Sequence, residues 1–348
     1  MTRVADRVVV GGVDTHKEIH VAAAVDGAGR ILGTKEFATT PAGHKAMLRW
    51  WARKGRLARV GVEGTGAYGA GLARFLAEEG VDIVEVDRPN RQLRRRRGKS
   101  DPVDAEAAAR AALSGEASGA PKARNGNVEM IRALRVAQRS AIKARAQATN
   151  QMHALVATAP DSVREPLRGL SSIRLVERCA RFRPGDVDTP EAAMKLALLE
   201  LARRHQSLTQ EIKRLDGHLD RLVAATSPGL VARFGVSTDT AGALLVAAGD
   251  NPGRLRSESS FAALCGVSPV QCSSGQLQRH RLNRGGDRAA NQALWRIVMV
   301  RLAHDPRTRH YMEMKRKQGR SKKEVIRCLK RYVAREVFAD LSRVPDLT

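Results

Sequence analysis

The sequence has few aromatic residues, few cysteines and no long apolar run. Phe, Trp and Tyr make up 3% of the 348 residues, so stacking of bases on exposed rings is not expected to dominate nucleic-acid binding. The four cysteines, Cys179, Cys265, Cys272 and Cys328, lack the paired spacing of a zinc site and are expected to be reduced thiols. Without a bilayer-length apolar run or a signal-peptide region, no membrane association and a cytoplasmic location are predicted.

Acidic residues are also scarce relative to basic ones. There are 61 Lys and Arg residues against 36 Asp and Glu, which gives a formal charge of +25. A surplus of this size favours a polyanionic partner, and we expect nucleic acid held mainly through its phosphates. General solubility is the alternative. The residues expected to contact nucleic acid on this basis are Arg94, Arg95, Arg96, Arg97 and Lys99 in one run, and Lys322 and Lys323 in a basic C-terminal helix.

The first third of the chain has the pattern of an α/β domain. Two β-rich runs within residues 8–26 are followed by a third at 31–37, which predicts an antiparallel start. Helices near 41–54 and 72–79 then alternate with short strands. Strands first, followed by alternating helix and strand, predict a mixed five-stranded sheet with helices on its faces over residues 1–115. If nucleic acid is the partner, the protein is expected to associate with the nucleoid.

Residues 121–226 are predicted to form a long helical, coiled-coil middle region. A helix extends to about residue 157, and a second covers about 191–225 with apolar residues in a seven-residue rhythm. A hairpin within one chain and a dimer of two chains both fit this rhythm. The prolines between the two helices indicate a loop.

Residues 227–348 are predicted to form a separate, mostly α-helical C-terminal domain. It contains two short helices, a loop over 268–287, and two helices near 288–303 and 322–341.

Four acidic residues in the first domain lie at the ends of predicted elements. Asp14 and Glu63 end strands, while Asp101 and Asp104 stand one turn apart where a helix begins. Taken separately, Asp101 is a helix cap and the others are ordinary terminal acids. Taken together, four carboxylates suit Mg²⁺ or Mn²⁺, and a pair of such ions can stabilise both oxygens of a phosphodiester displacement.

Five ordered motifs resemble a known family. "GVDTHKEIHVAAAVD", "GVEGTGAYG", "KSDPVDAEAAARAAL", "FAALCGVSPVQCSSG" and "NRGGDRAANQAL" look like those of the insertion-sequence transposases with a DEDD-type RuvC-like domain and a serine-bearing domain, the bridge-RNA-guided recombinases. The resemblance implies an RNase H/RuvC-like fold for residues 1–115 and a serine-bearing transposase domain for 227–348.

The same resemblance implies roles for individual residues. Asp14, Glu63, Asp101 and Asp104 match the four metal-binding acids, and Ser274 matches the nucleophilic serine, with Ser273 as the alternative one position earlier. The segment "LNRGGD" stands where the family has a more lysine-bearing loop, and Arg284 and Arg288 are expected to keep the phosphate contact there. Without the resemblance, two serines before a glycine are ordinary turn residues.

The implied function is an RNA-guided DNA recombinase of an insertion sequence. It would act on donor and target DNA, bind a structured guide RNA, work as a dimer or tetramer, and pass through a covalent phosphoserine link to DNA. Two other functions remain open. One is a metal-dependent RuvC-like nuclease or junction resolvase without a covalent step, and the other is a non-catalytic nucleic-acid-binding protein.

Overall fold

The computed structural model describes residues 7–86, 100–275 and 280–341. The chain forms two compact units. The first contains the described residues of Met1–Gly126 together with Ala248–Ser257, and the second contains those of Asn127–Ala247 and Glu258–Pro345. The predicted phosphate-contacting run Arg94, Arg95, Arg96, Arg97 and Lys99 lies outside the described residues. The predicted division into three domains stays a prediction.

The first unit is built on a mixed five-stranded sheet, as predicted. Its strands are β1 (Val8–Thr15), β2 (Ile19–Asp26), β3 (Ile31–Ala38), β4 (Arg56–Glu63) and β5 (Ile83–Val86), in the order β3-β2-β1-β4-β5. The first three strands form an antiparallel meander, while β4 is parallel to β1 and β5 is parallel to β4. Parallel neighbours place their carboxyl ends at one edge of the sheet.

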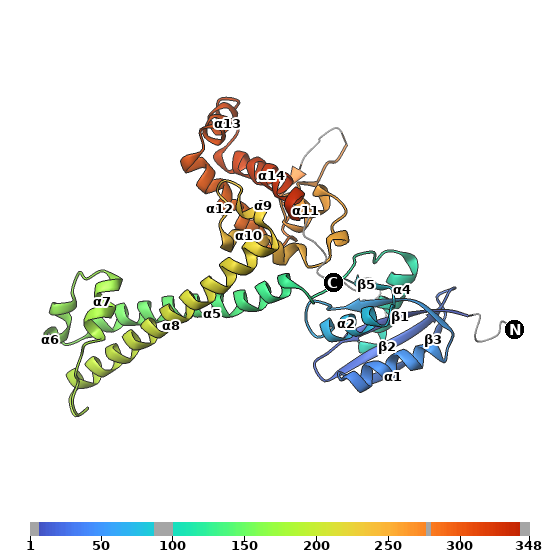
Figure 1. The fold of residues 1–348 in the computed structure, drawn as a ribbon, viewed down its shortest axis with the longest axis horizontal. Coiled ribbons are helices and arrows are strands. Elements are labelled where there is room, and N and C mark those ends of the chain that lie inside the picture. The colour runs from blue at the N-terminus through green and yellow to red at the C-terminus, as the bar shows by residue number, and fades with distance from the viewer. Residues whose placement is uncertain (1–6, 87–99, 276–279, 342–348) are drawn as a thin grey trace. The chain divides into compact units, whose positions relative to one another are not determined.

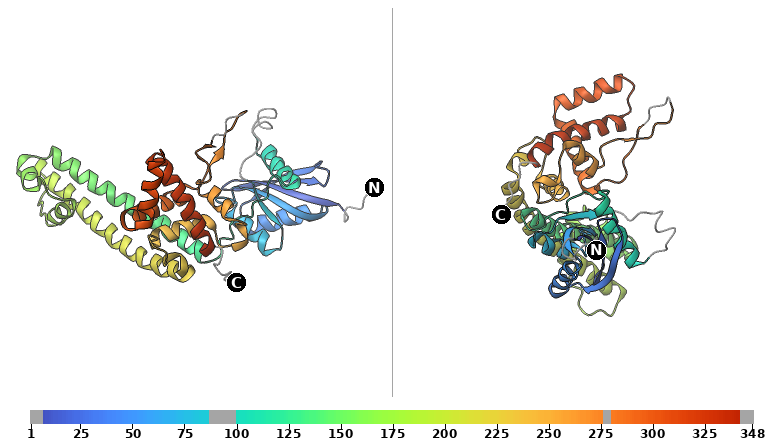
Figure 2. Two further views of the ribbon diagram at one scale, coloured as in Figure 1. Left: turned by 90° about the horizontal axis from the view of Figure 1, so that it is seen from above. Right: turned by 90° about the vertical axis from the view of Figure 1, so that its right-hand side faces the viewer.

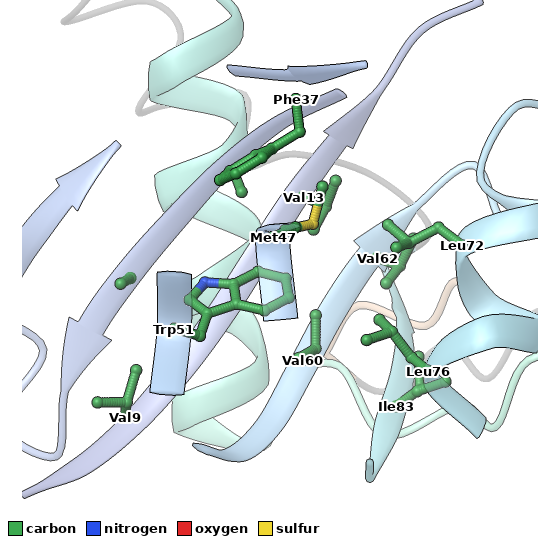
Figure 3. Close-up of a cluster of buried hydrophobic side chains, with 12 residues drawn as sticks. Val9, Val13, Phe37, Met47, Trp51, Val60, Val62, Leu72, Leu76 and Ile83 are labelled. Atoms are coloured by element: carbon green, nitrogen blue, oxygen red, sulfur yellow. The ribbon is translucent and has the colours of Figure 1, made fainter. Parts of the chain in front are cut away.

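Helices cover both faces of this sheet (Figures 1 and 2). Helices α1 (Pro41–Ala52) and α2 (Ala70–Glu78) pack on one face, and α4 (Asp101–Ser114) packs on the other. Because side chains alternate along a strand, Val9 and Val13 of β1 face the first pair of helices, whereas Val10 faces α4. Figure 3 shows the first of these two cores, in which Trp51 and Met47 of α1 are completely buried.

Helix α4 lies unusually close to the sheet because both surfaces are made of small residues. A Cβ atom on Gly12 of β1 would lie 2.2 Å from the carbonyl oxygen of Ala105, and one on Gly61 of β4 would lie 2.5 Å from that of Ala108. No side chain fits in that space. The α4 residues that pack against the strands are themselves alanines, namely Ala105, Ala108, Ala109 and Ala112.

The second unit begins with a helical hairpin. Helices α5 (Asn127–Thr158) and α8 (Pro190–Thr226) pack along one another within one chain, so the intrachain alternative accounts for the heptad pattern (Figure 1). Supercoiling of the pair stays a prediction. The connection predicted as a loop instead contains α6 (Asp161–Arg164), a 3₁₀ turn and α7 (Ser172–Cys179), which cover the end of the hairpin with their own small core.

The rest of the second unit is mostly helical, as predicted. Helix α12 (Arg288–His304) and helix α14 (Lys322–Leu341) match the two predicted C-terminal helices, and α13 (Pro306–Lys317) between them was not predicted. The other described elements of this part are α9 (Pro228–Val231), α10 (Thr238–Ala248), α11 (Glu258–Leu264), β6 (Val270–Gln271) and β7 (His280–Arg281). A 3₁₀ turn at Pro252–Arg254 lies in the segment that belongs to the first unit. Among the described residues, no helix combines the length and apolarity needed to cross a bilayer.

Candidate functional site

Asp14 and Glu63 lie on neighbouring strands at one edge of the sheet. The register pairs Val13 of β1 with Val62 of β4. Asp14 and Glu63 are the next residues on these two strands, so their backbones lie about 4.8 Å apart. The hydroxyl of Thr15 donates to the carbonyl oxygen of Glu63 at 2.8 Å and ties the two strand ends together. Since Gly12 and Gly61 face α4, the side chains two residues further along face the same side.

The other two acids come from the first turn of α4, on that same side of the sheet. Asp101 is the first helical residue and Asp104 lies one turn later. Ser100, rather than Asp101, occupies the N-cap position, and its side chain makes no cap hydrogen bond. The capping role considered for Asp101 is therefore one residue out of place. Asp104 is only 2% exposed, so α4 carries its carboxylate into the protein rather than toward solvent.

A histidine that sequence reasoning missed joins the two sets of acids. The Nε2 atom of His16 lies 3.2 Å from Oδ2 of Asp14 and 3.3 Å from Oδ2 of Asp101. Potential ligand atoms of these three residues all lie within 4.8 Å of one another. The position of His16 two residues after Asp14, in "DTH", was the only available signal, and it gave no indication of contact with a helix that begins 85 residues later.

The electrostatics of Asp14 reflect this crowding. Burial raises the pKa of the Asp14 carboxyl above its ordinary value, and the negative charges of Asp104 and Asp101 raise it further, while His16 opposes the shift. The charge of Asp14 is thus disfavoured by its surroundings when the protein carries no cation. A divalent ion would reverse this balance, because it favours the ionised form of every carboxylate that it contacts.

The donor set suits a hard divalent cation. Carboxylate oxygens are the ligands preferred by Mg²⁺ and Mn²⁺, and the imidazole nitrogen of His16 adds a ligand that Mn²⁺ accepts more readily than Mg²⁺. Buried carboxylates are stable only when charge or hydrogen bonds compensate them. The cluster formed by Asp14, His16 and Asp101, with Asp104 beside it, fits such an ion.

The two candidate serines of the second unit lie after β6. Ser274 is exposed, whereas Ser273 is half-buried and its Oγ accepts a hydrogen bond from Nε2 of Gln271 at 3.3 Å. A nucleophile must reach its substrate, so the exposed hydroxyl is the better placed of the two. The assignment of Ser274 stays a prediction.

The cations predicted to contact phosphate differ in their surroundings. Arg284, Arg288, Lys322 and Lys323 are all exposed. Three other cations of α14 have partners within the protein. Lys330 is 8% exposed and donates to Oδ1 of Asn291 at 2.9 Å, and the guanidinium groups of Arg331 and Arg335 both bind Glu258 at 2.6 and 2.7 Å.

Two protein-family models match this chain, and the matched segments include parts of both units. A family model described as "Transposase", of the DEDD type, matches residues 11–159, and one described as "Transposase IS116/IS110/IS902 family" matches residues 231–313. A curated relative from Streptomyces coelicolor, "Insertion element IS110 uncharacterized 43.6 kDa protein", is 26% identical over 151 residues. That alignment covers 42% of this chain and 37% of the relative. The two matched regions contain all four acids and both serines, and the chain belongs to the IS110 family of insertion-sequence transposases.

Proposed function

We propose that the protein is a DNA recombinase that moves an insertion sequence by cutting and rejoining DNA. The observation that carries this proposal is the meeting of Asp14, Asp101 and His16 at the end of β1, with the buried Asp104 next to them. Their convergence joins a strand to a helix far along the chain. Titratable groups that gather in this way are candidates for a functional site.

Asp14, Glu63, Asp101 and Asp104 would hold two divalent cations, Mg²⁺ or Mn²⁺. When bound, such ions stabilise the charge on the attacking and leaving oxygens of a phosphodiester displacement. The acids of the chain then have a positioning role. Asp14 and Glu63 are fixed by the sheet, and Asp101 and Asp104 are fixed by the close packing of α4 on Gly12 and Gly61.

Ser274 would supply the nucleophile. Its Oγ attacks the phosphorus, a bond forms between Oγ and phosphorus, and the bond from phosphorus to one DNA oxygen breaks. The serine proton is lost to a base or water, and the leaving DNA oxygen gains a proton. Attack by a DNA hydroxyl on the phosphoserine reverses these changes and restores the phosphodiester without an external energy source.

The partners proposed with this chemistry are donor DNA, target DNA and a structured guide RNA from the same element. Pairing with RNA would select the target, which leaves the protein to bind backbone. Strand exchange between two duplexes requires more than one active site, so a dimer or tetramer is expected. Because its substrate is DNA, the protein is expected in the nucleoid. Purified protein should carry RNA derived from the flank of its coding region, and RNA-free protein with full recombination activity would contradict guidance by RNA.

An adduct assay tests the nucleophile. Donor DNA is incubated with wild-type protein, Ser274→Ala and the matched variant Ser273→Ala in Mg²⁺, then denatured and separated. Covalent protein–DNA species are expected with wild type and Ser273→Ala and should be absent with Ser274→Ala. The reverse pattern would assign Ser273. Metal-dependent cleavage without an adduct in any of the three proteins would identify a junction-resolvase mechanism with water as nucleophile.

A metal titration tests the acid cluster. Asp101→Asn should lose Mg²⁺-dependent cleavage while it retains binding to DNA, because the phosphate-contacting cations are untouched. Undiminished cleavage would leave Asp101 with no metal role. A wild-type protein that binds DNA but cuts none across the Mg²⁺ titration would be a non-catalytic binding protein.

A further inference from the structure

A groove in the first unit adjoins the acid cluster and shares two residues with it. Its volume is about 480 Å³, within the range of roughly 300–1,000 Å³ that small-ligand sites occupy. His16 and Asp101 form the end that belongs to the cluster, and Ile19, Val21 and Tyr68 supply the apolar wall. A ligand that reaches the cluster therefore has a continuous path into the groove.

Two apolar side chains on the wall of this groove are exposed to solvent. Tyr68 is 55% exposed and Ile19 is 44% exposed. The chain has only three tyrosines, and the rings of the other two, Tyr311 and Tyr332, contact one another edge to face with centroids 5.7 Å apart. In a sequence with few aromatic residues, a ring presented to solvent beside a cluster of acids indicates a surface that another molecule covers.

Tyr68 is carried on a rigid turn. Directly after β4, the amides of Ala67 and Gly69 donate to the carbonyl oxygen of Gly64 at 2.9 and 3.2 Å. The guanidinium of Arg124 donates to the carbonyl oxygen of Gly66 at 2.9 Å. Because the backbone is held on both sides of the ring, a flat ligand stacking there would order little that is not already ordered.

The charges around the groove select which part of a nucleotide enters it. Away from the acid cluster, Lys17, Glu18 and Glu36 lie on its wall, and Lys17 is paired with Glu18 at 3.2 Å. The net negative charge of these three side chains disfavours phosphate in this part of the groove. The phosphate would stay at the cation-binding end, and the uncharged, flat part of the nucleotide would occupy the apolar part.

We propose that this groove binds an unpaired nucleobase next to the phosphate that the acid cluster holds, stacked on the ring of Tyr68. The inference rests on the proposed function, since it takes the acid cluster as the phosphate site. A base in the groove has left its own stack, and a tyrosine ring replaces the lost stacking partner. Contact with the face of a base is independent of sequence, so this subsite positions the strand without selecting its sequence.

The experiment uses the full chain and a short single-stranded oligodeoxynucleotide of mixed sequence that carries one 5-iodouracil. Irradiation in Mn²⁺ should cross-link the iodouracil to Tyr68, as mapped by mass spectrometry. Removal of Mn²⁺ should lower the yield, because the phosphate is then no longer held beside the groove. Tyr68→Ala removes the ring that is cross-linked, and it should also lower the affinity for the oligodeoxynucleotide in Mn²⁺ at least fivefold, which is the lower end of the effect of one stacked base.

Two variants control for other causes. Tyr68→Phe keeps the ring and should keep the cross-link. Tyr332→Ala removes a ring of similar exposure on α14, 52% exposed, and should leave the cross-link at Tyr68 unchanged. Tyr68 is 55% exposed, so its truncation should leave the unfolding temperature close to that of wild type, which a melting curve checks.

The outcomes separate this inference from the proposed function. If wild-type protein cuts donor DNA in Mn²⁺ but Tyr68 is not cross-linked and Tyr68→Ala cuts at the wild-type rate, the base subsite is overturned and the recombinase proposal stands. If no DNA is cut but the Mn²⁺-dependent cross-link to Tyr68 is found, the subsite stands and the recombinase proposal fails.

Discussion

Replacement of Gly12 by alanine should damage the fold and the site together, although it adds one methyl group far from solvent. The new Cβ would lie 2.2 Å from the carbonyl oxygen of Ala105 and 2.2 Å from the amide nitrogen of Ala109. Both are backbone atoms of α4, so no side-chain rotation can relieve the overlap. Carbon contacts are optimal at about 3.5 Å, so α4 must move away from β1 by about 1 Å.

The expected magnitude follows from this displacement. Overpacking of a filled core typically costs ~1–3 kcal/mol of unfolding free energy, and backbone neighbours favour the upper part of that range. The moving helix also carries Asp101 and Asp104 away from Asp14. Misplacement of catalytic groups by about 1 Å can lower a rate about 100-fold, so the loss of cleavage should exceed what the loss of folded protein explains.

Three measurements check this prediction. Urea unfolding gives the stability, calorimetric titration with Mn²⁺ gives the metal affinity, and cleavage of donor DNA gives the rate at a temperature where the variant is fully folded. Gly27→Ala is the control, because a Cβ at Gly27, in the turn after β2, meets nothing within 4 Å. A Gly12→Ala protein that unfolds, binds Mn²⁺ and cuts DNA like Gly27→Ala would refute the coupling of α4 packing to the site.

Two further predictions concern charge. Asp14→Asn should raise the melting temperature of metal-free protein, because burial and the charges of Asp101 and Asp104 disfavour the Asp14 carboxylate. Saturating Mn²⁺ should raise the melting temperature of wild type by roughly 5 °C and that of the variant by much less. Equal shifts in the two proteins would argue against a metal site at Asp14. His20, fully buried and stacked on His44, has its pKa lowered by burial from 6.5 to about 4. The folded protein therefore binds fewer protons than the unfolded chain between these values, and stability should fall as the pH drops below 6.5, by about 2 kcal/mol at pH 5. His20→Leu should remove that part of the pH dependence in urea unfolding, and an unchanged profile would show that His20 does not cause it.

Local patterns were sufficient to predict the strands and helices of residues 8–114. Alternating apolar residues over residues 8–26 and 31–37 identify strands wherever they occur, and "DPVD" marks the start of a helix by its proline and acids. Asp14 and Glu63 could be placed at strand ends for the same reason. That they share an edge follows from the parallel pairing of β1 with β4, which the structure shows.

Features that depend on distant contacts could not be predicted. The contact of His16 with Asp101 exists because α4 docks on Gly12 and Gly61, and neither glycine shows in the sequence which helix packs against it. The heptad rhythm of residues 191–225 is the same for a hairpin and for a dimer, so only the structure identifies α5 as a partner of α8.

The missed helices have different explanations. Helix α13 has no buried residue, so it has no apolar stripe for a sequence pattern to reveal. Helix α7 is short and lies among prolines that indicated a loop, although its buried residues Leu175, Val176 and Cys179 do follow a helical spacing.

The central claim is that the carboxylates gathered at the end of β1 bind divalent cations. Anomalous diffraction at the manganese edge, from crystals of the protein soaked in Mn²⁺, tests it most directly. Manganese should be bonded to Asp14 and Asp101, and it should be lost in crystals of Asp104→Asn. Manganese found only elsewhere on the protein, with the Asp14 carboxylate free of metal at saturating Mn²⁺, would contradict it.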